Sequence, residues 1–446
     1  MASPALPPEL WCLVLGNLDA EDGATLANLS LVSKQLQAIV QPVLYRDISA
    51  KQFCHPSFAA SLCSRPLGKS RGQAVREVAV ELQLDVERLA KLSNGEAPSH
   101  EEIEMAQAKP RAEWARIYSI LKQCPAVVKL RVKMDCPPSS DPQLNLISPE
   151  SVFPHAFVPS TTDLLALPMI KTLRYFALFV PTGANLDTQS FGQLIAAAVR
   201  LETVELEQVD ASRLFEPTVQ QIAKGSPHPV IQHLVHSEGC VRDGRDSIRF
   251  EDYIACWVQM PSIRTFHCTC PYPEFDPEIP QWHGITSLQI QHLQPPAFDD
   301  SDTPWLEQLD IIFPSVQHLS LFLPLIIFRT PFQPILRNLK ALCLGYTAPE
   351  ELLQLKCQLP IMLRQLLASD FAPHLDSLYM GVADIDIDGL RPRGPDTSWV
   401  GVCVKDVCEI QSQRPLLQSV QLADGPASAL LLREEDGRFS DLFEET

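Results

Sequence analysis

Two hydrophobic periods divide the chain. Near the N-terminus, apolar residues recur every three or four positions, which is the spacing of one face of an α-helix. From about residue 75 onward, a short phrase with apolar residues at its first, fourth and sixth positions returns many times. The second half of this phrase alternates apolar and polar residues, as a half-buried β-strand does. The sequence therefore predicts a small helical unit followed by a repeat that contains strands.

The N-terminal pattern predicts three short helices, at residues 9–18, 24–32 and 34–40. Two prolines precede the first helix, and proline suits the first turn. Pro42 is expected to end the third, because proline lacks the backbone N–H that a helix interior needs. Three helices in about 45 residues cannot bury much apolar surface, so the unit is expected to need a partner.

The segment after Pro42 is apolar enough to pack rather than to act as a solvated linker. We expect Leu44 and Tyr45 to be buried against the start of the repeat region, around residues 78–84. Ile48 is expected to begin an extended segment. A flexible tether is the alternative interpretation of this junction.

The repeating phrase predicts one strand per copy, and segments with helical periodicity, such as residues 100–124 and 187–200, lie between copies. In the copy at residues 316–323, Leu319, Leu321 and Leu323 should share the buried face, with Ser320 and Phe322 on the other. Copies begin about 22 to 42 residues apart, which is long enough for a strand and a helix. The first apolar positions are Ile170, Leu201, Ile231, Ile263, Ile285, Val316, Leu339, Leu375 and Leu417.

This organisation resembles a degenerate leucine-rich repeat. The resemblance implies an α/β fold, namely an irregular solenoid with a parallel sheet on its concave face and helices on its convex face. The Asn or Cys that usually follows each strand in such repeats is mostly absent here. An α/β domain whose strands are sequential but do not form a solenoid is the alternative.

The N-terminal unit opens with "LPPEL" and closes with "LSLVSKQLQAIVQPVLYRDI", and in this order and spacing it resembles an F-box of the fungal type. In that family the unit docks on the Skp-type adaptor of a cullin-RING ubiquitin ligase. The alternative is a helical cap on the repeat region, with all its leucines internal. The resemblance implies that the adaptor-binding residues are Leu6, Pro7, Leu10, Val14, Leu29 and Val32.

These patterns divide the chain into three parts. Residues 1–48 form the F-box-like helical unit, residues 49–432 form the irregular leucine-rich-repeat-like solenoid, and residues 433–446 are expected to be an acidic, mobile tail.

Composition narrows the class of protein. The formal net charge of −18 disfavours nucleic acid as a partner, because affinity for phosphates comes from Lys and Arg. No basic region precedes the first apolar patch, and no apolar run approaches the roughly 20 residues of a membrane span. Many of the 13 cysteines lie in apolar runs, as buried free thiols do. We therefore expect a cytoplasmic or nuclear protein that does not associate with membranes.

Two local patterns imitate metal sites. Asp384, Asp386, Asp388 and Gly389 match the first half of a calcium loop, but Pro395 occupies the position that should supply a bidentate carboxylate.

His267, Cys268 and Cys270 could begin a zinc site, but a paired CxxC is absent, and strand alternation puts both cysteines in buried positions. No phosphate-binding glycine loop, nucleophile elbow or HExxH helix is present. We expect no catalytic residue, no metal and no cofactor.

The sequence thus favours a non-catalytic substrate receptor of an SCF-type ubiquitin ligase, which binds the adaptor through the F-box and an unidentified protein target through the solenoid. An interaction scaffold without a ligase role is the main alternative, and a hydrolase with a site assembled across repeats is a more distant one. Candidate target contacts on exposed strand positions and the turns just after them are Arg174, Glu205, His236, Arg264, Gln289 and Gln317.

Overall fold

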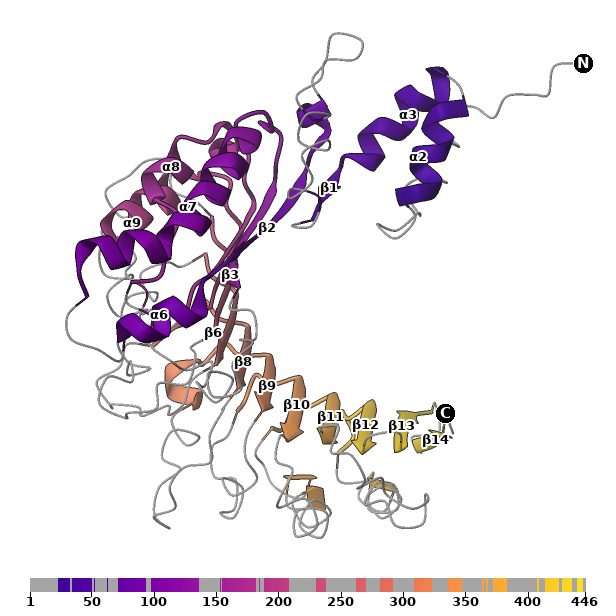
Figure 1. The fold of residues 1–446 in the computed structure, drawn as a ribbon. Helices are drawn as coiled ribbons and strands as arrows, with labels where there is room; N and C mark the ends of the chain where they lie inside the picture. The colour runs from indigo at the N-terminus through magenta and orange to yellow at the C-terminus, as the bar shows by residue number, and fades with distance from the viewer. Residues whose placement is uncertain are drawn as a thin grey trace, which may run out of the picture. The chain divides into compact units, whose positions relative to one another are not determined.

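The computed structural model forms two compact units, Met1–Ile231 and Gln232–Thr446, here called unit 1 and unit 2 (Figure 1). The residues that the structure describes are 23–32, 34–49, 52, 62, 71–93, 98–135, 153, 155–181, 184, 188–207, 230–237, 262–269, 281–291, 309–322, 336–346, 363–364, 366–367, 372–382, 407–408, 414–424, 427–434 and 439–443.

Unit 1 begins with two packed helices, α2 (Gly23–Val32) and α3 (Lys34–Leu44). Leu26 of α2 and Val40 of α3 are buried between them. Both helices were predicted from the apolar spacing, and both are confirmed. The predicted first helix, at residues 9–18, lies outside the described residues.

The expected end of α3 at Pro42 is wrong, because the helix continues to Leu44. Proline removes one N–H donor, but the turn beyond it is retained by the Tyr45 amide, which donates to the Gln41 carbonyl at 3.1 Å. Val43 and Leu44 also pack on the cluster of Leu26 and Val40. Partial burial of these two side chains stabilises the last turn, and it places Leu44 against the helical unit.

The junction with the repeats is packed and extended. Strand β1 (Asp47–Ile48) pairs in parallel with β2 (Glu77–Gln83), which confirms the extended segment at Ile48. Tyr45 is 8% exposed, and the Arg71 guanidinium carbon lies 5.2 Å from the centre of its ring. The burial of Tyr45 favours a packed junction over a tether.

The remaining strands of unit 1 continue a parallel sheet in the order of the chain. They are β3 (Lys129–Asp135), β4 (Tyr175–Phe179) and β5 (Thr203–Glu207). The connecting segments contain α6 (Val86–Ser93), α7 (His100–Leu121), α8 (Thr161–Leu165), the 3₁₀ helix η4 (Pro168–Lys171) and α9 (Thr188–Ala197). Helices α7 and α9 confirm the two helical segments predicted between copies of the phrase.

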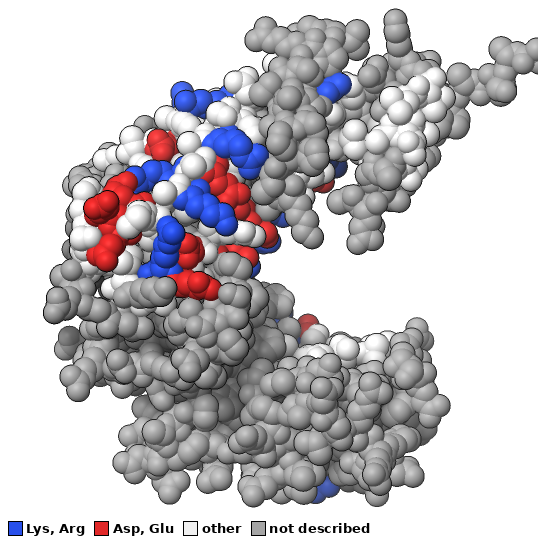
Figure 2. All heavy atoms as spheres, in the orientation of Figure 1, with Lys and Arg blue, Asp and Glu red and all other residues white. Residues whose placement is uncertain are grey.

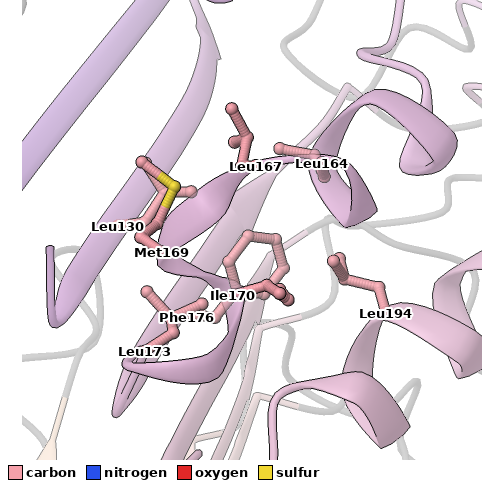
Figure 3. A pocket seen from close by; sticks show the side chains of 8 residues that line it. All are labelled: Leu130, Leu164, Leu167, Met169, Ile170, Leu173, Phe176 and Leu194. Carbon is pink, nitrogen blue, oxygen red and sulfur yellow. The ribbon is translucent and has the colours of Figure 1, made fainter. Parts of the chain in front are cut away.

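One face of this sheet packs against the helices. Leu130 of β3 and Phe176 of β4 point toward α8, η4 and α9, where they meet Leu164, Met169 and Leu194 around a cavity of about 10 Å³ (Figure 3). A void of that size is barely large enough for one water, and its lining is apolar. It therefore belongs to the core and offers no room for a ligand.

Unit 2 repeats the parallel arrangement through β12 and then reverses. The parallel strands are β6 (His233–Ser237), β7 (Thr265–Thr269), β8 (Ser287–Gln291), β9 (His318–Phe322), β10 (Ala341–Tyr346), β11 (Ser377–Val382) and β12 (Ser419–Asp424). Two antiparallel strands, β13 (Ala427–Arg433) and β14 (Phe439–Phe443), follow.

The expected mobile tail at residues 433–446 is corrected by β14, which pairs with β13 from Phe439 to Phe443. The expectation rested on the number of acidic residues and did not consider the apolar residues of this segment. Phe439 is 8% exposed, and the guanidinium carbon of Arg433 lies 5.3 Å from its ring centre. Backbone pairing and this contact hold a segment that charge alone would assign to solvent.

The alternation of the repeating phrase is confirmed in both units. Leu319 and Leu321 of β9 are 2% and 1% exposed, while Ser320 between them is half-buried. Leu323 lies outside the described residues. One register was wrong: the apolar residue that leads into β4 is Leu173 rather than Ile170, because Ile170 lies in η4 and Phe176 and Leu178 occupy the buried strand positions.

A backbone device recurs just before the strands. The carbonyl just before the strand of one copy accepts two consecutive N–H groups from the next copy, at 2.7 to 3.1 Å. This ladder satisfies backbone groups at the start of the strands. The accepting carbonyls belong to Arg46, Arg76, Val128 and Arg174 in unit 1 and to Gln232, Arg264, Thr286, Gln317, Lys340 and Asp376 in unit 2.

Candidate protein-interaction surfaces

The first candidate surface lies at the end of α2. Leu31 is 82% exposed and Val32 is 69% exposed, the two highest values among the exposed large apolar side chains of the described residues. Adjacent exposed apolar residues on a short helix are unfavourable in water and are typical of a site that a protein partner covers.

The predicted adaptor-binding residues separate into three groups. Val32 is exposed as expected, whereas Leu29 packs on the α2–α3 core. Leu31 was not among the predicted residues; it lies about 140° around the helix from the buried Leu26 at 100° per residue, and this offset could have predicted its exposure. Leu6, Pro7, Leu10 and Val14 lie outside the described residues.

The second candidate surface is the side of the unit 1 sheet opposite the helices, here called the open face of unit 1. Alternation places every second residue of each strand on it, and the parallel registers align these residues into columns. Its members are Asp47 from β1; Glu77, Ala79, Glu81 and Gln83 from β2; Lys129, Arg131, Lys133 and Asp135 from β3; Tyr175, Ala177 and Phe179 from β4; and Thr203, Glu205 and Glu207 from β5. Ala177 is itself buried by its neighbours.

The three cations of this face lie on β3, and each has an acidic neighbour. Lys129 Nζ lies 3.3 Å from Glu77 Oε2, and Lys133 Nζ lies 3.4 Å from Asp135 Oδ1. These side chains are 36% to 47% exposed, so the pairs contribute little to stability. They do orient these charged side chains on the face.

Arg131 joins a three-residue network across the strands. Its Nη2 donates to Tyr175 Oη at 3.2 Å and lies 3.6 Å from Glu205 Oε2. Tyr175 in turn donates to the same carboxylate. The Arg131 guanidinium carbon also lies 5.5 Å from the Phe179 ring centre, within the range of a cation–π contact.

The acidic side chains of the face outnumber the cations by six to three. Within the described part of the chain, Glu81 and Glu207 have no cation within ion-pair distance. Burial raises the pKa of Glu207, with Glu205 reinforcing the shift and Lys133 and Arg131 opposing it. Burial also raises the pKa of Asp47. Figure 2 shows acidic and basic side chains interspersed over unit 1.

The corresponding face of unit 2, here called the open face of unit 2, is neutral along its central row. The registers align Val235, His267, Gln289, Ser320, Cys343, Tyr379 and Gln421. Burial lowers the pKa of His267 and raises that of the Cys343 thiol, and it also raises that of Tyr379. This row therefore presents uncharged groups at neutral pH.

The possible zinc ligands do not converge. Cys268 lies in the buried row of β7, and His267 points to the opposite face of the same strand. Among the described residues, no three His, Cys, Asp or Glu side chains gather in a metal-binding arrangement. Cys270 and the calcium-like segment at residues 384–390 lie outside the described residues.

The predicted target contacts also divide. Glu205 and Gln289 lie on the open faces of their units. Arg174, Arg264 and Gln317 lie just before strands and supply carbonyls of the backbone ladder. His236 lies in β6, but its side chain is not among those that the structure describes.

None of the described helices is both long and apolar enough to cross a lipid bilayer.

Similarity to a known protein family lies at the N-terminus. The sequence matches the F-box-like family at residues 4–51. No curated protein matches the chain. Among solved structures, it is similar to the crystal structure of the leucine-rich repeat-containing protein LegL7 from Legionella pneumophila, with 13% identity, a TM-score of 0.39, and coverage of 88% of this chain and 92% of that one. The family match assigns an F-box-like domain to residues 4–51.

Proposed function

We propose that this chain is a non-catalytic substrate receptor of an SCF-type, cullin-RING ubiquitin ligase. The F-box-like domain binds a Skp-type adaptor, and the repeat region binds the protein to be ubiquitinated. The match at residues 4–51, together with the exposed apolar pair on α2 inside it, carries this proposal.

The exposed pair favours this function over a simple helical cap. A cap would turn its apolar residues toward the repeat region, as Tyr45 does. Leu31 and Val32 instead remain exposed, so a partner is needed to remove them from water. At about 25 cal/mol per Å² of apolar surface, their burial would contribute a useful part of the binding free energy.

Ubiquitin transfer requires no reacting group on this subunit. A receptor accelerates transfer by holding the target's lysines near the charged conjugating enzyme, which raises their effective concentration. The paired β1 and β2 strands and the buried Tyr45 favour a fixed angle between the α2–α3 unit and the first repeats. A fixed angle would restrict which lysines are reached. The same role places the protein in the cytoplasm or nucleus.

The test is binding of the purified chain to a purified Skp-type adaptor. Leu31→Glu with Val32→Glu should weaken binding about 100-fold, because charges enter a desolvated contact. The matched control is Met105→Glu with Ile311→Glu, which changes exposed apolar residues 49% and 54% accessible elsewhere in the chain. This control should bind as the parent does.

A second pair tests the residues of the predicted first helix. Leu10→Asp with Val14→Asp should also abolish adaptor binding while the repeat region remains folded, as measured by circular dichroism. Failure of the parent chain to bind any Skp-type adaptor would favour the scaffold function. Undiminished binding by both double variants would place the adaptor contact elsewhere.

A further inference from the structure

On the open face of unit 1, one row near the C-terminal ends of the strands has two carboxylates and one cation. The registers align Glu81 of β2, Lys133 of β3, Phe179 of β4 and Glu207 of β5 side by side. Carboxylates therefore stand at both ends of the row, with an aromatic ring and the stem of a lysine between them.

The two terminal carboxylates form no ion pair with the cations of this face that the structure describes. Lys129, Arg131 and Lys133 are already engaged with Glu77, Glu205 and Asp135. In the described part of unit 1, no cation lies within ion-pair distance of Glu81 or Glu207. A partner that supplies two cations would neutralise both carboxylates without breaking an existing pair.

Glu207 should attract a cation more strongly than Glu81 does, because of its position. It is partly buried, whereas Glu81 is exposed. A partly desolvated carboxylate gains more from a cation than a fully hydrated one does, because solvent screens the pair less. Phe179, beside it in the register, offers an apolar contact next to this charge.

The spacing of the row selects the shape of the partner. Neighbouring strands lie about 4.8 Å apart, so Glu81 and Glu207, three strands apart, are separated by about 14 Å. In an extended peptide, residues four apart point to the same side and lie about 13 Å apart. The residue midway between them would face Phe179 and the Lys133 stem.

We propose that this row binds an extended segment of the target protein with two basic residues four positions apart and an apolar residue between them. The inference rests on the proposed receptor function and names the chemistry of the segment that the receptor captures. The acidic excess of the surrounding face, six carboxylates to three cations, adds long-range attraction for such a segment.

The probe is a capped synthetic peptide with the core Lys-Ser-Leu-Ser-Lys, carrying a neutral dye, and its binding to the full chain is measured by fluorescence anisotropy. Two other peptides test charge and spacing. Glu-Ser-Leu-Ser-Glu reverses the charges, and Ser-Lys-Leu-Lys-Ser keeps the composition but places the cations two residues apart. The first peptide should bind at least about tenfold more tightly than the acidic one and about threefold more tightly than the close-spaced one.

Variants of the chain test the two carboxylates. Glu81→Lys with Glu207→Lys should lower affinity for the first peptide about tenfold. The matched control, Glu113→Lys with Glu434→Lys, changes the net charge equally outside this face and should stay within about twofold at 0.15 M salt, where long-range charge is screened. Glu81→Gln with Glu207→Gln avoids any folding defect from a partly buried lysine, and it should weaken binding about threefold.

Tighter binding of the acidic peptide, equal binding of the two lysine peptides, or equal loss in the charge-reversed variant and its control would overturn the proposal. Adaptor binding is measured on the same preparations. Adaptor binding without the expected peptide preference would overturn only this inference, whereas the expected preference without adaptor binding would overturn only the ligase role.

Discussion

The open face of unit 1 is charged, whereas the central row of unit 2's open face is neutral, although both sheets bury the same alternate strand positions. Phe176 and Leu178 are buried in β4, and Phe266 and Cys268 are buried in β7. Core packing restricts the buried row to apolar side chains, and it places no such restriction on the opposite side. The open faces can therefore differ between units without cost to the shared fold.

The largest expected effects test the shared buried row. Phe176→Ala in unit 1 and Phe266→Ala in unit 2 remove side chains that are 1% and 0% exposed. Each should lower the free energy of unfolding by about 3 to 5 kcal/mol, because transfer energy is lost and a cavity remains. Urea unfolding followed by circular dichroism measures both. A cost below about 1 kcal/mol in only one unit would show that the two rows are not equivalent.

A smaller effect is specific to unit 2. A Cβ added at Gly381 would lie 2.5 Å from Tyr379 Oη, so the tyrosine ring lies across the glycine. Gly381→Ala should cost about 1 to 3 kcal/mol through overpacking. In the Tyr379→Ala background the same change should cost little, since the obstructing ring is gone. Equal costs in the two backgrounds, measured by thermal unfolding, would show that the Tyr379 ring is not the cause of the destabilisation.

The charge network of unit 1 should have a modest effect. A double-mutant cycle of Arg131→Ala and Glu205→Gln should give a coupling of about 0.2 to 1 kcal/mol, because both side chains are partly exposed. The coupling should shrink at 1 M salt. A salt-independent value would indicate that hydrogen bonds through Tyr175, rather than charge, couple Arg131 and Glu205.

The smallest expected effect is a gain in stability rather than a loss. Glu207 has a pKa raised by burial above its ordinary value of 4.5, so the folded chain binds this proton more tightly than the unfolded chain does. Stability from this group is highest at low pH and falls as the pH rises through the interval between the unfolded and folded pKa values. Glu207→Gln should therefore stabilise the chain at pH 7 by roughly 0.5 kcal/mol or less, after solvent screening is discounted. Thermal unfolding at pH 7 and below pH 4 should show a gain that disappears in acid.

The sequence predicted the exposure of some residues of the candidate surfaces, but it did not predict the contacts between them. The exposed position of Val32 and the open-face positions of Glu205 and Gln289 were predicted. The network of Arg131, Tyr175 and Glu205 was not, because its members come from three separate copies of the repeat. Contacts across strands depend on register, and register is set by the packing of the whole sheet.

Local spacing along the chain predicted the helices α2, α7 and α9 and the alternation that buries Leu319 and Leu321. These follow from local spacing, because a helix or strand turns each side chain by a fixed angle from the last. Three features depend instead on tertiary contacts: α3 continues past Pro42, Leu173 rather than Ile170 leads into β4, and residues 439–443 form a strand. In each case a distant contact outweighed the local preference, and local periodicity carries no information about distant contacts.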